Sequence, residues 1–347
     1  MTQLTHGGDW AGYRAQYGHD ALDFSANVSP LGLPQGVANA IAAALPHADR
    51  YPDPLCRALR AKLAPHEGIP AESILCGNGA ADLIFRLVWA AKPRTALVTA
   101  PTFAEYAAAL ESAGCAVRRH FLQAEVDFAV TDSILSSITP EVDMVFLCQP
   151  NNPTGQLTPL PLVERILRRC EACGALLVVD ECFLDFLPDC DTLTAKALLD
   201  SKNLLILKAF TKLYGMAGAR MGYLMANREI IEYLQRDSTG FCCSRMGLHA
   251  AEAALDDVEF QEMTKKGNQE GREILVSCMK ELGFRVWPSH TNFIYFDPGV
   301  DVKWFADRLL DYGIIIRGNF KANRISIGTP EEDRFVCKAM REIMANR

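Results

Sequence analysis

The sequence contains no long apolar run. No stretch of its 347 residues approaches the roughly 18 consecutive apolar residues of a transmembrane helix. The segment MTQLTHGGDW at the start lacks the basic and apolar regions of a signal peptide. Basic residues form no cluster or stripe and the formal net charge is −7, which argues against a nucleic-acid partner. We therefore expect a cytoplasmic protein that binds neither membranes nor nucleic acids.

A complete set of metal ligands is also missing. The twelve cysteines lack the regular density of a disulfide scaffold. Cys170 and Cys173 form a C-x-x-C, which is half of a metal or redox site, but no second C-x-x-C or H-x-x-H completes four ligands. Free cysteine packs as a small hydrophobe, so we favour reduced structural thiols there and at Cys242 and Cys243. No metal site is predicted.

The sequence does contain alternating apolar strands and amphipathic helices. With 49% hydrophobic and 22% charged residues, the chain has ample material for a core. Apolar runs predict a buried strand at 95–100 and further strands at 115–121, 144–148, 175–180 and 203–208. Helical spacing predicts helices at 81–91, 103–114 and 160–172. This order predicts an α/β fold with a mostly parallel central sheet covered by helices on both faces.

Beyond about residue 240 the pattern changes to longer helices and short alternating strands. We interpret this part as a smaller α+β domain joined by the N-terminal arm. The predicted division is a large domain at 46–240 and a small domain formed by 1–45 and 241–347. Ligands of such sheets bind beyond the carboxyl ends of the strands, so the polar segments that follow the apolar runs are the candidate site: 77–82, 100–106, 149–155, 180–183 and 208–212.

Each of these segments is a modest signal by itself. GNGAAD at 77–82 opens a helix, where exposed N–H groups suit a phosphate, but a plain turn has the same composition. Asp180 follows the apolar run ALLVV, and a buried carboxylate is costly unless it meets a cation. Lys208 and Lys212 both follow a probable strand, and either is a candidate for chemistry.

The order of the motifs is more specific than any one of them. N-P-T-G at 152–155, D-E-x-F at 180–183 and a lysine before G-x-R-x-G at 218–222 resemble the pyridoxal-phosphate enzymes with the aspartate-aminotransferase fold. The resemblance runs nearly end to end and implies pyridoxal 5'-phosphate as cofactor. It implies that Lys212 forms the Schiff base, that Asp180 faces the pyridine nitrogen and that Asn152 bonds to the ring hydroxyl oxygen.

The same resemblance implies how the rest of the cofactor is held. The phosphate would meet the backbone N–H groups of Ala80 and Ala81 together with Arg220, and Phe103 would stack on the ring. Two positions depart from the family pattern. The usual hydroxyl residue three before the lysine is Ala209, for which Thr211 would partly substitute, and the usual tyrosine of the D-E-A-Y motif is Phe183.

Two groups within the family share further motifs with the chain. Arg50-Tyr51-Pro52 matches the R-Y-P of histidinol-phosphate aminotransferases, which implies that Tyr51 reaches the cofactor phosphate of a neighbouring subunit in a homodimer; a simple turn is the alternative. HGGD at 6–9, LDFSANVSPLG at 22–32 and Phe183 resemble the threonine-phosphate decarboxylases of the cobalamin pathway. That resemblance implies a substrate site formed by His6, Gly7, Asn27, Asn152, Arg317 and Arg324.

The leading prediction is a lyase that decarboxylates L-threonine-O-3-phosphate. The alternative is a histidinol-phosphate-type aminotransferase that transfers an amino group to 2-oxoglutarate. The spacing of Arg317 and Arg324 is shorter than in either group, and RISIGT resembles the aminotransferases. A non-catalytic homologue is disfavoured by the presence of Lys212 and Asp180. A nicotinamide dehydrogenase is disfavoured because GNGAAD lacks the third glycine of G-x-G-x-x-G.

Overall fold

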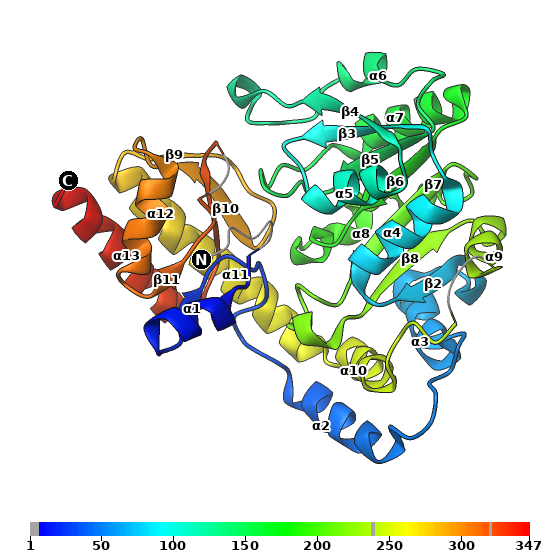
Figure 1. Ribbon diagram of the computed structural model, residues 1–347, viewed down its shortest axis with the longest axis horizontal. Coiled ribbons are helices and arrows are strands. Elements are labelled where there is room, and N and C mark those ends of the chain that lie inside the picture. The colour runs from blue at the N-terminus through cyan, green and yellow to red at the C-terminus, as the bar shows by residue number, and fades with distance from the viewer. Residues whose placement is uncertain (1–6, 237–239, 319–320) are drawn as a thin grey trace.

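The computed structural model describes residues 7–236, 240–318 and 321–347. The chain forms a larger lobe around a twisted sheet and a smaller lobe at one side of it, both visible in Figure 1. Among the described helices, none is long and apolar enough to cross a membrane.

The large lobe is organised by a seven-stranded sheet with the strand order β2-β8-β7-β6-β5-β3-β4. β3 to β7 pair in parallel, and β8 runs antiparallel to both of its neighbours. The strands span Ile74–Gly77 (β2), Thr95–Ala100 (β3), Ala116–Phe121 (β4), Met144–Cys148 (β5), Leu176–Asp180 (β6), Leu204–Ala209 (β7) and Gly222–Ala226 (β8).

Helices cover both faces of this sheet, because its central strands are apolar on both sides. In β5, Val145 and Leu147 belong to one buried cluster, whereas Met144 and Phe146 belong to the other. This two-residue alternation is the pleat of a strand. The predicted fold is confirmed. The helices of this lobe span Arg57–Glu67 (α3), Gly79–Ala91 (α4), Ala104–Ser112 (α5), Ile134–Ser137 (α6), Leu160–Cys173 (α7), Cys190–Leu193 (α8) and Arg228–Arg236 (α9).

The small lobe has its own apolar core. Phe24, Phe296 and Phe305 are buried there, together with Leu275 of the longest helix. Its strands pair as β1 with β11 and as β12-β10-β9. The elements span Trp10–Tyr17 (α1), Leu22–Asp23 (β1), Val258–Glu281 (α11), Arg285–Val286 (β9), Phe293–Asp297 (β10), Val302–Leu310 (α12), Ile314–Ile315 (β11), Asn323–Ser326 (β12) and Pro330–Ala345 (α13).

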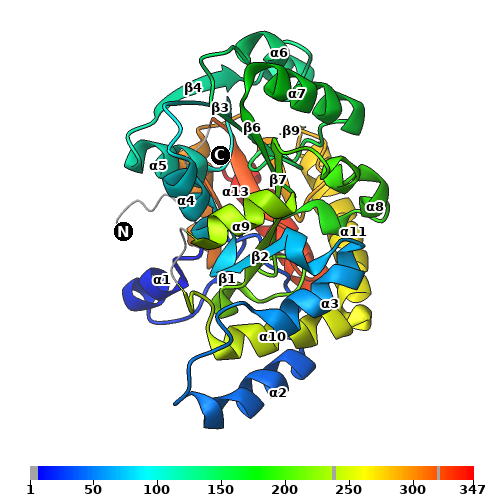
Figure 2. The same cartoon turned by 90° about the vertical axis from the view of Figure 1, so that its right-hand side faces the viewer.

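Two helices connect the lobes along the lower edge of the molecule. α2 (Gln35–Ala44) lies beside α10 (Arg245–Asp256) in both Figure 1 and Figure 2. Val37 of α2 and Ala250 of α10 are buried in the same apolar cluster as the sheet. The sequence analysis assigned both segments to the small domain, and the boundaries at 45/46 and 240/241 stay a prediction. Single 3-10 turns complete the chain at Leu45–His47, Ala71–Ser73, Ala124–Val126, Leu184–Phe186, Ala195–Leu198 and Ala217–Ala219.

Candidate active site

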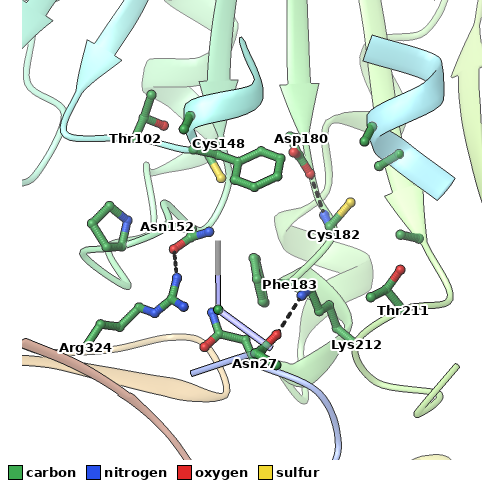
Figure 3. Close-up of a pocket in the computed structure, with 18 of the residues that line it drawn as sticks. Asn27, Thr102, Cys148, Asn152, Asp180, Cys182, Phe183, Thr211, Lys212 and Arg324 are labelled. Carbon is green, nitrogen blue, oxygen red and sulfur yellow. Dashed lines mark hydrogen bonds between the residues drawn. The ribbon is translucent and has the colours of Figure 1, made fainter. Parts of the chain in front are cut away.

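A cavity of about 250 Å³ lies at the carboxyl edge of the parallel strands, where the small lobe meets the sheet. Segments that follow β3, β5, β6 and β7 line it from one side, and the N-terminal segment and Arg317 and Arg324 line it from the other. Figure 3 shows these side chains converging on one space. The lining residues are Gly7, Ser25, Ala26, Asn27, Ala80, Ala81, Thr102, Phe103, Ala104, Cys148, Asn152, Pro153, Asp180, Cys182, Phe183, Ala209, Thr211, Lys212, Arg220, Arg317 and Arg324.

One residue of the sequence-predicted site lies away from the cavity, and another is not among the described residues. Tyr51 is 79% exposed and packs its ring on that of Phe241, with the ring centroids 4.7 Å apart, so it does not line the cavity. His6 lies outside the described residues. The other predicted site residues line the one cavity, although they come from segments as far apart in sequence as Gly7 and Arg324.

Lys212 presents a buried amine to the cavity. Its Nζ donates a hydrogen bond to the carbonyl oxygen of Ala26 at 3.1 Å and lies 5.6 Å from the ring centroid of Phe183. Burial, and then the positive charges of Arg324 and Arg220, lower the pKa of Lys212 to about 8. At pH 7 roughly a tenth of this lysine is therefore a neutral, nucleophilic amine, far more than for a lysine with its ordinary pKa.

Lys208 is held very differently, in a buried ionic cluster beside β7. Its ammonium lies 2.6 Å from a carboxylate oxygen of Asp185 and 3.4 Å from one of Glu67. Burial opposes its charge, but Asp185 and Glu67 hold the pKa of Lys208 well above its usual value. From its position in the sequence, Lys208 is a second candidate for chemistry. Its side chain is a structural cation, and it is absent from the residues that line the cavity.

Asp180 ends β6 with its carboxylate fixed by two donors. The hydroxyl of Tyr106 donates to Oδ2 at 2.6 Å, and the backbone N–H of Cys182 donates to Oδ1 at 3.0 Å. Tyr106 is fully buried, stacks on Phe146 and contacts the edge of Phe103. No motif in the sequence indicates a role for Tyr106. It lies in the segment APTFAEY that was singled out, but only the fold brings its hydroxyl to Asp180.

The N-terminus of α4 forms an anion cradle beside Lys212. Asn78 is its N-cap and provides no side-chain hydrogen bond, so the first N–H groups of the helix are open to a ligand. Gly79 has φ +83°, and a Cβ there would lie 2.6 Å from Nη2 of Arg220. The guanidinium of Arg220 therefore reaches the cradle only because residue 79 is glycine.

The opposite end of the cavity is cationic. Arg324 donates from Nη1 to Oδ1 of Asn152 and from Nη2 to the carbonyl oxygen of Ser25, both at 2.6 Å. Its backbone pairs with that of Arg317 across a tight antiparallel bridge. Burial, and then the charge of Arg317, lower the pKa of Arg324 to about 9. Two such guanidinium groups side by side favour an anionic ligand.

Asn27 lies between Lys212 and Arg324, as Figure 3 shows. It is 2% exposed and has φ 54°, in the left-handed region. Its backbone N–H donates to Oγ of Ser326 at 2.9 Å, and that hydroxyl donates to Oδ1 of Asn27 at 2.8 Å. The Oδ1 atom of Asn27 is therefore already engaged, which leaves its amide N–H groups to serve a ligand.

Comparison with known proteins accounts for this arrangement. The family model for aminotransferase class I and II matches residues 19–340. The chain belongs to the class I and II aminotransferase family. A threonine-phosphate decarboxylase from Salmonella typhimurium is 33% identical over 93% of this chain and 91% of its own length. A histidinol-phosphate aminotransferase from Methanococcus aeolicus is 30% identical over 94% of this chain and 90% of its own length.

Solved structures carry the same fold. The histidinol-phosphate aminotransferase from Sinorhizobium meliloti, in complex with pyridoxal-5'-phosphate, matches this aminotransferase-family chain with a TM-score of 0.89 and 26% identity. The match covers 99% of this chain and 96% of that one. Enzymes of this family depend on pyridoxal 5'-phosphate, which is therefore the cofactor of this chain.

The cavity fits this cofactor. The buried amine of Lys212 has only a carbonyl partner among the described residues, and its lowered pKa suits reaction with an aldehyde. The cradle formed by α4 and Arg220 suits a phosphate, and the carboxylate of Asp180 suits a ring nitrogen that carries a proton. Described His, Cys, Asp and Glu side chains form no group of three able to hold a metal ion.

Proposed function

We propose that this family member decarboxylates a phosphorylated amino acid, L-threonine-O-3-phosphate. The observation that carries the proposal is the pair of buried guanidinium groups of Arg317 and Arg324 at the end of the cavity opposite the phosphate cradle. A substrate that bears both a phosphate and a carboxylate supplies two anions for them. Arginine presents a planar fork that matches either anion in a bidentate manner.

The proposed roles on the cofactor side follow from the contacts. The N–H groups of Ala80 and Ala81 and the guanidinium of Arg220 hold the phosphate, and Asp180 faces the ring nitrogen. When bound, pyridoxal 5'-phosphate supplies an electron sink for the bond that breaks at the substrate carbon. Lys212 holds the cofactor before the substrate arrives and afterwards carries a proton to or from that carbon, for which a pKa of about 8 is well matched.

The remaining proposed contacts fix the ring and the substrate. Phe103 lies on the ring face, Asn152 bonds to the ring hydroxyl oxygen, and Thr211 assists at the phosphate where Ala209 has no hydroxyl. Gly7 packs so tightly on Ser25 that a Cβ would lie 2.2 Å from its carbonyl oxygen. That contact supports the proposed role of Gly7, with its neighbour His6, in holding the phosphate of the substrate.

Orientation of the substrate decides between the two reactions. The bond that lies perpendicular to the cofactor ring is the one that breaks. A decarboxylase therefore has to direct the carboxylate out of the ring plane, whereas an aminotransferase directs the Cα–H there. Arg324 is anchored by Asn152 and Ser25, and Asn27 by Ser326. This rigid set supports selection of one orientation.

The relatives support both reactions to a similar degree. The decarboxylase from Salmonella typhimurium is 33% identical, and histidinol-phosphate aminotransferases reach the same identity. We favour decarboxylation because the N-terminal segment, with Gly7 and Asn27 at the cavity, is the part that resembles the decarboxylases. A histidinol-phosphate-type aminotransferase remains the second candidate.

The test uses the purified, cofactor-loaded enzyme with L-threonine-O-3-phosphate. We expect release of carbon dioxide without 2-oxoglutarate. In a parallel assay with histidinol phosphate and 2-oxoglutarate, we expect little glutamate. Formation of glutamate with no carbon dioxide from any phosphorylated amino acid supports the aminotransferase and refutes the decarboxylase. Arg324→Gln serves as a control, because loss of an anion contact should raise KM for a phosphorylated substrate in either reaction.

A further inference from the structure

Four of the cysteines, three of them buried and one half-buried, meet in a row of thiols outside the active site. We call Cys76, Cys56, Cys243 and Cys242, in that spatial order, the thiol row. Cys56 is hydrogen-bonded to the thiols of Cys76 and Cys243. The sulfurs of Cys243 and Cys242 are 3.8 Å apart. These residues come from three segments that are distant in the sequence, so no sequence motif indicates the row.

The surroundings of the row favour a thiolate at Cys56 or at Cys242. Nη1 of Arg86 donates to Sγ of Cys242 at 3.2 Å. A hydrogen bond from Cys243, and then one from Cys76, lower the pKa of Cys56, and a hydrogen bond from Cys243 also lowers the pKa of Cys242. Cys243 carries one S–H, so it donates to only one of these two thiols at a time. Cys56 is also the N-cap residue of the 11-residue helix α3, where the helix dipole favours negative charge.

We propose that Cys56 and Cys243 are an oxidation site that closes to a disulfide bond when the protein meets a peroxide. The Cys56 thiolate attacks one oxygen of hydrogen peroxide, the O–O bond breaks, and a sulfenic acid and hydroxide form. The sulfur of Cys243 then attacks the sulfenic sulfur, and water leaves as the S–S bond forms. In total, two thiols and one hydrogen peroxide give one disulfide and two waters, so two electrons pass from sulfur to peroxide oxygen.

Cys243 is a better partner for Cys56 than Cys76 is. A disulfide requires two sulfurs to approach from contact distance to about 2.05 Å, so one backbone has to shift. Cys76 lies in β2, whose backbone is fixed by pairing with β8. Cys243 lies in an irregular turn before α10, outside any strand or helix. This turn can therefore move without breaking a hydrogen bond between β-strands.

The disulfide would join two segments that already touch. Nη2 of Arg245 donates to the carbonyl oxygen of Tyr51 at 2.8 Å, and the rings of Tyr51 and Phe241 pack together. Cys56 and Cys243 lie a few residues beyond these contacts in each segment. Closing the bond therefore fixes the segment that carries the exposed Tyr51 to the start of α10.

The test maps disulfides in the full-length, cofactor-loaded enzyme after brief treatment with hydrogen peroxide. Free thiols are blocked with iodoacetamide, the protein is digested with trypsin without reduction, and the peptides are sequenced by mass spectrometry. We expect residues 51–57 linked to 237–245, with fragment ions that place the bond on Cys243 rather than Cys242. Dithiothreitol should remove the link.

Matched variants separate the row from general oxidation. The link should disappear in Cys56→Ser and Cys243→Ser and persist in Cys242→Ser. Cys278→Ser, which alters a second pair of adjacent cysteines in the small lobe with Cys337, should also leave it unchanged. Three outcomes would each overturn the proposal: an internal Cys242–Cys243 disulfide, a disulfide between Cys56 and Cys76, or sulfinic acid at Cys56 without any disulfide. All three can be detected in the wild-type protein alone.

Discussion

Lys212 and Lys208 are four residues apart in the sequence, but their ammonium groups have different surroundings. Lys208 meets two carboxylates, which keep it charged, whereas Lys212 meets a carbonyl oxygen and two nearby guanidinium groups, which favour the neutral form. The difference is electrostatic, since both side chains are largely removed from water. This difference supports the proposal that Lys212, and not Lys208, reacts with the cofactor.

The field of Arg324 on Lys212 gives a prediction about pH. Because Arg324 contributes to the lowered pKa of Lys212, about 8, its replacement by glutamine should raise that pKa. A higher pKa leaves less neutral amine at a given pH, so the rate of cofactor uptake by the cofactor-free protein should reach half-maximum at higher pH. Arg324→Lys keeps the charge and should shift the profile less. Absorbance measured across pH 6 to 10 checks this, and coincident profiles for the two variants would contradict it.

Tyr106 gives a second prediction at the same scale. Tyr106→Phe removes the hydroxyl that donates to Asp180 and leaves a buried carboxylate with one donor fewer. A hydrogen bond to a charged group contributes about 1.5–3 kcal/mol, so affinity for pyridoxal 5'-phosphate should fall by roughly 10- to 100-fold. Absorbance titration of the cofactor-free protein measures this loss.

Tyr223→Phe is the matched control, because Tyr223 is also buried and donates to a carboxylate, that of Glu67, away from the cavity. It should lower thermal stability and leave cofactor affinity near that of the wild type. Equal losses of affinity in the two variants would show that Tyr106 acts through general stability alone.

Among the elements, the start of α4 contributes most directly to the site. The strand β2 ends at Gly77, and the helix begins two residues later with its N–H groups toward the cavity. Gly222, at the start of β8, packs on this turn: a Cβ there would lie 2.8 Å from the backbone N of Ala80. Two glycines on different elements therefore shape one cradle.

Gly79→Ala tests the cradle. The residue has φ +83°, and the new methyl group would meet the guanidinium of Arg220. We expect a loss of roughly 1–2 kcal/mol in the free energy of unfolding from the left-handed backbone, and in addition weaker binding of the cofactor. Gly174→Ala at the end of α7 has a similar φ, +72°, with no atom within 4 Å of the new Cβ. Gly174→Ala should lower only the stability and leave cofactor affinity unchanged. If Gly79→Ala also has normal cofactor affinity, the cradle does not bind the cofactor phosphate.

At the scale of the whole molecule, the exposed Tyr51 has no role in the site of its own chain. It lies outside the cavity of its own chain, and its proposed role is to reach the cofactor phosphate of a second copy. A homodimer with shared sites follows from that proposal. In such a dimer, a Tyr51 defect in one subunit and a Lys212 defect in the other fall in the same site, so the second site of the mixed pair keeps both native residues.

Mixing two inactive variants tests the shared site. Tyr51→Ala and Lys212→Ala should each be inactive or nearly so. After they are unfolded and refolded together, half of the dimers are mixed, and each has one site with both native residues, so activity should recover to about a quarter of the wild type. Lys202→Ala, on the surface, controls for the refolding procedure. No recovery in a mixture that sizing shows to be dimeric would contradict a site shared through Tyr51.

The sequence by itself determined the α/β fold and the cofactor. Apolar runs such as 95–100 and 144–148 became strands with the same bounds, because burial on both faces leaves a continuous signal in the residues. The ordered motifs around Asn152, Asp180 and Lys212 were enough to indicate pyridoxal 5'-phosphate.

The tertiary structure alone decided which polar groups meet. The bond from Tyr106 to Asp180, the ionic cluster of Lys208 and the thiol row join segments up to 187 positions apart, as between Cys56 and Cys243. Contacts of that kind depend on how strands are ordered and lobes are packed, and neither periodicity nor local spacing contains that information. For the same reason, the sequence did not indicate that β8 lies between β2 and β7 and runs antiparallel to both.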